Sequence, residues 1–365
     1  MDKPEVTRRT FLTLPAAAVV LNARAQSPND TVRVAFIGVG NRGAYLLQHM
    51  KNVPGIKVVA LCDLNAETLA KAAATTPGAD TVADYHKLLD RTDIDAIVIA
   101  TPVDTHRDIA VAALDSAKHV YSEKPMALTP EECRSILTTA KSAKGIYQAG
   151  FQLRHDPNRH ASIDFIHSGG LGRVLFCQGY RHTGDLPRET AWYFDVKRSG
   201  NNIVEQACHI LDLFTWSIGD HPLRAMGSGG VNLYKDLPPG RTTYDNYAVI
   251  YEFPNDVRLC FSHIYFDPDG FSGVKERVFG AHGAIDLASA TWRELTKGTP
   301  PVKLDVPDAG KDSTYLSLAA FIDNVRGHKT PLNNAESARR STLVAMMGRK
   351  AMAEKRIVTW EEMDV

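Results

Sequence analysis

A glycine-rich turn between an apolar strand and a helix constrains this chain most. The apolar run Val32–Ile37 leads directly into the string Gly-Val-Gly-Asn-Arg-Gly. In such a unit the first glycine allows a tight turn, the second lets a phosphate approach the backbone, and the third permits close helix–strand packing. The helix N-terminus then offers N–H groups to an anion. The residues expected to bind a dinucleotide here are Gly38, Gly40, Asn41, Arg42 and Gly43.

An acidic residue after the next apolar run indicates which dinucleotide is bound. Asp63 ends the second predicted strand, twenty residues after Gly43. A carboxylate at this place accepts hydrogen bonds from both hydroxyls of the adenosine ribose and repels a 2′-phosphate. We therefore expect NAD as the cofactor, in preference to NADP.

From residue 31 to residue 150, short apolar runs alternate with helical patterns. The apolar runs are nearly continuous, which indicates strands buried on both faces. Successive βα units with right-handed crossovers predict a doubly wound parallel sheet, a Rossmann domain of α/β class. The predicted strands are Val32–Ile37, Lys57–Leu61, Ala96–Ala100, Val120–Tyr121 and Ile146–Ala149, and the predicted helices are Arg42–Lys51, Ala66–Ala74, Arg107–Ser116 and Pro130–Lys144.

After Phe151 the pattern changes to that of an α+β domain. Strand-like runs separated by turn residues predict a large, open, mostly antiparallel sheet with a few helices on one face. We expect a substrate-binding and oligomerisation domain over residues 151–330 and, over residues 331–365, a C-terminal helix that packs back on the body. The predicted strands are Val174–Tyr180, Tyr247–Phe253, Val257–Ile264 and Val274–Phe279, and the predicted helices are Asn158–His167, Val204–Trp216, Ser313–Val325 and Ala335–Ala353.

Residues 1–25 have the pattern of a twin-arginine export signal. Arg8 and Arg9 precede the apolar run Leu12–Leu21 and the small-residue string Ala23-Arg24-Ala25. This order matches a charged region, a short apolar region and a cleavage site. A run of about ten residues is too short to cross a bilayer, which needs roughly twenty. We expect export by the twin-arginine machinery to the periplasm or another extracytoplasmic compartment, with an uncleaved anchor as the alternative.

Charge and cysteine content narrow the class of protein. The 42 basic and 42 acidic residues cancel, and no basic patch indicates a nucleic-acid partner. A small, roughly neutral ligand is the simplest expectation. The five cysteines are far apart and include no C-x-x-C pair, which argues against a disulfide framework. Such a chain suits folding in a reducing cytoplasm before export.

The string Ser122-Glu123-Lys124-Pro125-Met126 follows a strand end, at the sheet edge where the cofactor is expected. With the glycine turn, Asp63, Ala100–Pro102 and the segment Glu205–Asp212, it makes most of residues 31–215 resemble the family of glucose–fructose oxidoreductase, inositol dehydrogenase and MocA (Gfo/Idh/MocA). The resemblance implies a nicotinamide-dependent oxidoreductase that acts on carbohydrates, cyclitols or related polyols.

In that family the lysine of the E-K-P string contacts the reacting hydroxyl and the nicotinamide ribose, so the resemblance implies a catalytic role for Lys124. An ammonium there lowers the pKa of a substrate hydroxyl or polarises a ketone oxygen. Ala100-Thr101-Pro102 ends another strand at the same edge. His106 suits a surface or capping position equally well. The residues expected along the nicotinamide side of the cofactor are Thr101, Pro102, His106, Glu123 and Lys124.

Glu205 and His209 suggest a general base. They are four residues apart in the predicted helix Val204–Trp216 and therefore share one face. A carboxylate beside an imidazole orients its tautomer and stabilises its protonated form. Members of the family typically carry aspartate where this chain has Glu205, so the resemblance supports His209 as the base and leaves the role of Glu205 open. We treat Lys124, His209 and Glu205 as the candidate catalytic residues.

Aromatic and polar side chains of the second domain are candidates for substrate binding. Aromatic rings pack on the C–H faces of sugars, and polar side chains bind sugar hydroxyls. No metal site is expected, because His155 and His160 lack a carboxylate or cysteine at a recognised ligand spacing. Packing in the core or at a subunit interface is the alternative for each candidate. The expected substrate-binding residues are Arg154, Tyr180, Trp192, Tyr193 and Asp212.

The export signal and the cofactor site together constrain the reaction cycle. Free NAD is scarce outside the cytoplasm, so a dehydrogenase with exchangeable cofactor stops there after one turnover. We expect the chain to bind NAD before export and regenerate it in place. It does so either by reducing a second sugar or by returning the hydride to the same substrate during glycoside cleavage outside the two-carboxylate scheme. The alternatives are a conventional NAD-dependent sugar dehydrogenase and a non-catalytic binding protein. The open second sheet also predicts a homo-oligomer.

Overall fold

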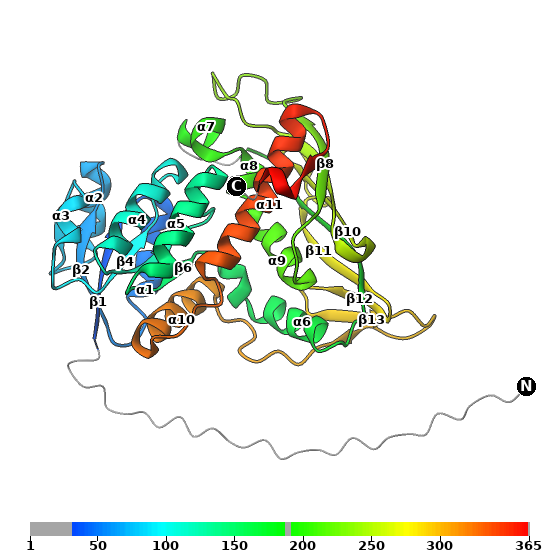
Figure 1. Ribbon diagram of the computed structural model, residues 1–365, viewed down its shortest axis with the longest axis horizontal. Helices are drawn as coiled ribbons and strands as arrows, with labels where there is room; N and C mark the ends of the chain where they lie inside the picture. Colours follow the sequence, from blue (N-terminus) through cyan, green and yellow to red (C-terminus); the bar gives the residue numbers. More distant parts are fainter. Residues whose placement is uncertain (1–30, 187–190, 364–365) are drawn as a thin grey trace, which may run out of the picture.

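The computed structural model describes residues 31–186 and 191–363, so the expected export signal lies outside the described residues. Two sheets organise the molecule, one at each side of the view in Figure 1, with helices between them. Of the helices in the described ranges, none is long and apolar enough to span a membrane.

The first sheet has six parallel strands in the order β3-β2-β1-β4-β5-β6. Its helices cover both faces (Figure 1). All four residues of β4 are buried. The predicted Rossmann sheet is confirmed, with the additional short strand β3. The strands are β1 Val32–Ile37, β2 Ile56–Cys62, β3 Asp80–Val82, β4 Ala96–Ile99, β5 His119–Ser122 and β6 Tyr147–Ala149, and the helices are α1 Asn41–Met50, α2 Ala66–Ala74, α3 His86–Leu89, α4 His106–Asp115 and α5 Pro130–Ser142.

Local sequence explains where these helices begin. The Thr129 side chain accepts a hydrogen bond from the Glu132 N–H, and the Glu132 carboxylate accepts one from the Thr129 N–H, so α5 starts with a capping box. Pro130 occupies the first turn, where an N–H is not needed. Helix α2 begins after Asn65, whose side chain accepts from the Thr68 N–H.

The second sheet has nine strands in the order β14-β13-β12-β11-β7-β10-β9-β8-β15. It is mostly antiparallel, as predicted, but β7 and β10 pair in parallel. Burial alternates along β10, because helices cover only one face of this sheet (Figure 1). The strands are β7 Val174–His182, β8 Arg224–Gly230, β9 Asn246–Glu252, β10 Arg258–Ile264, β11 Gly273–Gly280, β12 Gly283–Asp286, β13 Thr291–Glu294, β14 Val302–Lys303 and β15 Val358–Thr359.

Helices of the second half connect the two sheets. Helix α10 (Ser313–Gly327) packs its buried Leu318 and Phe321 into the core of the first sheet beside Val34. The 20-residue α11 (Ala335–Glu354) contacts α5, α9 and β8 and runs between the sheets (Figure 1). The remaining helices are α6 Pro157–His167, α7 Val196–Ser199, α8 Asn202–Glu205 and α9 Cys208–Ile218, with short 3-10 turns η3 Gln152–His155 and η4 Ala191–Phe194.

Candidate active site

The glycine turn between β1 and α1 leaves no room for side chains at two of its glycines. Gly38 has a φ of +83°, and a Cβ there would lie 2.6 Å from the carbonyl oxygen of Ala100. A Cβ at Gly43 would lie 2.0 Å from the carbonyl oxygen of Gly38. At Gly40, by contrast, no atom of the described chain lies within 4 Å of a Cβ. The backbone at Gly40 is therefore open to a ligand.

The N-terminus of α1 lies at the same opening. Gly40 is its N-cap, and within the described structure no side chain caps this end, so the N–H groups of the first turn remain available to an anion. A groove of about 580 Å³ adjoins the turn between α1 and α2, and Val39 and Asn41 are among the residues that line it. These features fit the pyrophosphate of a dinucleotide.

Asp63 follows β2 and holds the glycine turn. Its Oδ2 accepts a hydrogen bond from the Val39 N–H at 2.9 Å, and its Oδ1 accepts one from the Asn65 N–H at 2.8 Å. Each carboxylate oxygen carries a second lone pair. The side chain therefore fixes the turn and keeps acceptor capacity for ribose hydroxyls.

Glu123 and Arg42 form an ion pair beneath the E-K-P string. Glu123 is buried, and its Oε1 accepts from Arg42 Nε at 2.7 Å while its Oε2 accepts from the Lys124 N–H at 3.2 Å. Burial opposes the charge of Arg42, but Glu123 outweighs that effect and raises the pKa of Arg42. Both oxygens of Glu123 thus bind protein groups and position Arg42 and Lys124, and the expected contact of Glu123 with the cofactor stays a prediction.

His106 is also a positioning residue. It is 1% exposed, with Nδ1 at 2.9 Å from the carbonyl oxygen of Pro125 and Nε2 at 3.0 Å from that of Thr101. Its expected cofactor contact is therefore wrong, since the ring is sealed between the end of β4 and the loop after Lys124. Thr101 and Pro102 lie partly exposed at the edge of the sheet, where they were expected.

Lys124 binds Glu205. Its Nζ donates to Glu205 Oε1 at 2.8 Å and also to the Glu205 carbonyl oxygen. Both side chains are largely buried. Burial opposes the charge of Lys124, but the carboxylate of Glu205 more than offsets it, so the pKa of Lys124 is raised. Lys124 is therefore a protonated amine held at one place.

The helix predicted over Val204–Trp216 is wrong, because the chain breaks between α8 and α9. The Ala207 N–H donates to the carbonyl oxygen of Asn202, so the regular i to i−4 pattern is lost at this point. The break leaves the Glu205 carbonyl available to Lys124. Glu205 and His209 consequently lie on different helices, and Glu205 pairs with Lys124 rather than orienting His209.

His209 lies near this ion pair with a neutral ring. Its Nδ1 is sealed from solvent and has no hydrogen-bond partner in the described residues, and its ring packs edge-on against Phe151. Burial lowers the pKa of His209 far below the usual value, and the positive charges of Lys124 and Arg42 lower it further. A neutral imidazole beside a fixed ammonium has the protonation state that a general base needs.

Arg154 and Asp212 bind each other in the interior instead of binding substrate. Arg154 donates from Nε and from a terminal nitrogen to the Asp212 carboxylate at 2.7–3.1 Å, and Asp212 Oδ1 also accepts from Ser341 at 2.5 Å. Asp212 is 0% exposed and Arg154 is 5% exposed. The expected substrate contacts of both residues are wrong, because the pair joins η3, α9 and α11.

Strand alternation places Tyr180 on the outer face of the second sheet and Arg181 on the inner face. A Cβ at Gly179 would touch the ring of Phe214 on α9, so odd-numbered residues of β7 face the helices here. Tyr180 instead stacks on His182, two residues along the strand. The expected substrate contact of Tyr180 is therefore wrong. Arg181, near the end of the same strand, is a weaker candidate from the sequence, and the period of two along β7 favours it over Tyr180 for the inner face.

Tyr193 and Trp192 occupy the loop before α7. Tyr193 is buried and donates to the hydroxyl of Tyr265, which donates to Gln206 Oε1 at 2.6 Å. Gln206 is the residue at the break between α8 and α9, so Tyr193 acts on the site through this chain of hydrogen bonds. Trp192 is partly exposed and packs edge-on against Tyr193. It keeps a surface for a ligand.

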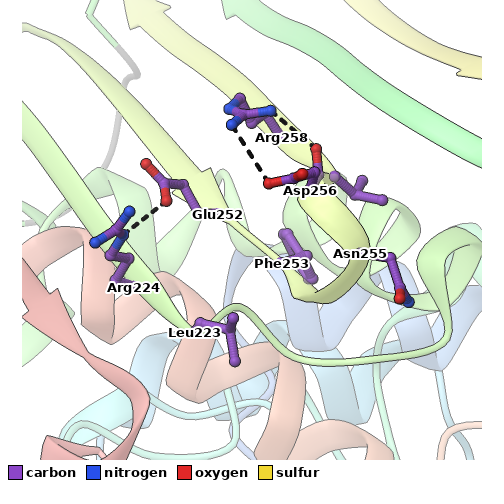
Figure 2. Close-up of a pocket in the computed structure, with 8 residues that line it drawn as sticks. Leu223, Arg224, Glu252, Phe253, Asn255, Asp256 and Arg258 are labelled. Carbon is purple, nitrogen blue, oxygen red and sulfur yellow. Dashed lines mark hydrogen bonds and ion pairs between the residues drawn. The ribbon is translucent and has the colours of Figure 1, made fainter.

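A hollow of about 470 Å³ lies away from these residues, at the start of β10. Figure 2 shows its walls, in which Arg224 pairs with Glu252 and Arg258 pairs with Asp256. His263 and Tyr265 mark the other end of β10, so the hollow is a strand length from the Lys124 site. Its carboxylates, Glu252 and Asp256, are each paired with an arginine of the same hollow.

Family models match both halves of the chain. Residues 32–151 match the oxidoreductase family model with an NAD-binding Rossmann fold, and residues 162–286 match the GFO/IDH/MocA C-terminal domain. The inositol 2-dehydrogenase of Salmonella paratyphi B is 30% identical over 308 residues, which cover 82% of this chain and 88% of that protein. The scyllo-inositol 2-dehydrogenase (NAD(+)) of Bacillus subtilis is 27% identical over 314 residues, with the same shares covered.

Two other similarities bear on the reaction and on the fold. A glycosyl hydrolase family 109 protein of Shewanella pealeana is 30% identical over 205 residues, or 51% of this chain and 45% of that protein. The solved structure of a levoglucosan dehydrogenase in complex with NADH and levoglucosan superposes with a TM-score of 0.80 at 18% identity. That superposition covers 90% of this chain and 99% of the other, and it shows a shared fold.

Proposed function

This chain belongs to the Gfo/Idh/MocA family of oxidoreductases, and from that premise we propose that it oxidises a carbohydrate or polyol with NAD, using Lys124 and His209. The observation that carries the proposal is the Lys124–Glu205 pair beside the neutral His209, at the carboxyl edge of the first sheet. Inositol dehydrogenases among its relatives support the substrate class.

The two residues divide the proton chemistry. His209 takes the proton of the substrate hydroxyl, and the ammonium of Lys124 stabilises the negative charge that develops on the oxygen. Glu205 keeps Lys124 protonated and in place. NAD, when bound at the glycine turn and Asp63, supplies the hydride acceptor. Asp63 supports NAD over NADP, because its carboxylate accepts from ribose hydroxyls and repels a 2′-phosphate.

We further propose that the redox cycle closes within one protein molecule. The twin-arginine pattern over residues 1–25 supports this, because an enzyme exported by that route has little free NAD to exchange. The similarity to a family 109 glycosyl hydrolase favours the version in which the hydride returns to the same substrate. In that version oxidation at C3 acidifies the C2 proton, the C1 substituent is eliminated, water adds, and the C3 ketone is reduced again.

The closed cycle is tested with protein purified from its native host. Mass spectrometry of a denatured extract identifies any retained nucleotide, and a panel of glycosides and free sugars is then supplied without added cofactor. Stoichiometric NAD(H) and repeated turnover support the proposal; protein that carries no nucleotide and requires added NAD is a conventional dehydrogenase instead. His209→Asn is the matched control, which should retain nucleotide and lose turnover.

Export and assembly are proposals with their own tests. Replacing Arg8-Arg9 with Lys-Lys should retain the precursor in the cytoplasm, as fractionation and comparison of precursor and mature lengths will report. Exported Lys-Lys precursor would contradict twin-arginine transport. On the outer face of the second sheet Ile250 is 39% exposed, which supports pairing of subunits through this face. Sedimentation of the wild type and of Ile250→Asp tests that assembly.

A further inference from the structure

Within residues 31–186 and 191–363, the inner face of the second sheet carries one cation without an acidic partner, Arg181 on β7. We propose that the substrate is an anionic sugar whose carboxylate or phosphate group pairs with Arg181. This inference rests on the proposed function and adds the chemical class of the substrate. It also replaces the expectation of a neutral ligand. That expectation came from the net charge of the whole chain, whereas the positive charge of Arg181 acts only on its surroundings.

The other cations around the site are each paired with a carboxylate. Arg42 binds Glu123 at 2.7 Å and Lys124 binds Glu205 at 2.8 Å. The remaining pairs, both at 2.7 Å, are Arg154–Asp212 and Arg159–Glu276. For Arg181, no side-chain hydrogen bond or ion pair exists with any residue in the described ranges. Its five N–H donors are thus left for a ligand.

The groups on which the charge of Arg181 acts include four rings, and the Glu205 carboxylate, which is paired with Lys124, acts on two of them. The positive charge of Arg181 acts on Tyr193, Tyr247, His263 and Tyr265, which lie in the loop before α7 and at the ends of β9 and β10. His263 Nε2 is sealed from solvent and lacks a partner among the described residues. A partly buried guanidinium in such surroundings is poorly solvated, so an oxyanion that forms two parallel hydrogen bonds with it binds strongly.

The charge balance around His209 points to the same class of substrate. After burial, the largest effects on its pKa come from the positive charges of Lys124, Arg42, Arg181 and Arg159, which lower it. An anion bound at Arg181 offsets part of this potential and lets His209 accept a proton more readily. An anionic substrate would therefore raise the pKa of His209 as well as neutralise the charge of Arg181.

Matched sugars test the proposal with the NAD-loaded protein. Glucose, glucuronate and glucose 6-phosphate share one ring and differ in charge, and galactose with galacturonate gives a second series. We expect kcat/KM to favour an anionic member by about 100-fold, and Arg181→Gln to remove that preference. Comparison of the uronates with glucose 6-phosphate shows whether Arg181 binds a carboxylate or a phosphate group. Arg181→Lys should recover part of the preference, because it restores the charge without the planar fork.

Binding gives a second readout. The anionic sugar should raise the melting temperature of the NADH-loaded wild type, and Arg181→Gln should abolish this rise. Arg277→Gln is the control, because Arg277 lies on the outer face of the same sheet and is half-exposed. Equal use of neutral and anionic sugars, or an unchanged preference in Arg181→Gln, overturns the inference and leaves the oxidoreductase intact. Absence of hydride transfer with every sugar overturns the proposed function instead, and the melting shift then still tests Arg181.

Discussion

The two sheets differ in how they present side chains to the site. In the first sheet, β4 is buried at every residue, so its functional groups come from the strand ends and from backbone at the glycine turn. In the second sheet, β10 alternates between buried and partly exposed residues, so function depends on which face a residue occupies. The cofactor half is therefore built from backbone geometry, and the substrate half from side-chain orientation.

Lys124 lies where the two halves meet, and its replacement should have the largest effect. Lys124→Met removes the ammonium that Glu205 holds, so we expect kcat/KM to fall by about 10³-fold, or about 4 kcal/mol of transition-state stabilisation. The bound nucleotide content should stay unchanged. Lys141→Met, on the exposed surface of α5, is the control. A fall in kcat/KM of less than tenfold would contradict a catalytic role for Lys124.

Replacing Gly43 and Gly40 in turn should distinguish a glycine needed for backbone packing from one needed for contact with the ligand. Gly43→Ala places a methyl group 2.0 Å from a backbone oxygen, so the free energy of unfolding should drop by about 3 kcal/mol. Gly40→Ala meets no described atom within 4 Å and should leave the melting temperature unchanged while weakening NAD binding. Denaturation and nucleotide titration measure both variants. Equal destabilisation would contradict the distinction between the two positions.

The two faces of the second sheet should differ in stability. Leu259 on β10 is 0% exposed, and Leu259→Ala should cost about 3 kcal/mol of unfolding free energy. Ile250 on β9 is 39% exposed on the outer face of the single subunit, and Ile250→Ala should change the unfolding free energy of the monomer by less than about 0.5 kcal/mol. Urea denaturation at a fixed protein concentration compares them. Similar losses would mean that the outer face is also packed.

Acid should destabilise the region where the halves join. Burial lowers the pKa of His155 to about 4, below the usual value near 6.5, so the unfolded chain binds more protons between these values. Stability is therefore full above about pH 6.5 and is lost as the pH falls, by about 2 kcal/mol at pH 5 from this residue. Urea unfolding at pH 7.5 and 5 checks this. His155→Gln should reduce the pH dependence, whereas His86→Gln, on an exposed side chain, should not.

Local signals predicted the first half well, because they act over a few residues. The starts of α2 and α5 follow from Asn65 and from the Thr129 capping box. The same kind of reasoning failed for the helix over Val204–Trp216. There a break between α8 and α9 is held by the Lys124 ammonium and by a tyrosine hydroxyl, which come from distant parts of the chain. Periodicity within the segment carries no sign of either contact.

The sequence by itself determined the Rossmann sheet, the open second sheet, the glycine turn and the place of Lys124 at a strand end. These depend on local backbone preference and on the period of apolar residues. Only the tertiary structure decided that Glu205 pairs with Lys124, that Arg154 and Asp212 pair with each other, and that Arg181 lies on the inner face of the second sheet. Each of those outcomes depends on which charged side chains come into contact when the chain folds. Lys124 and Glu205, for example, are 81 positions apart in the sequence.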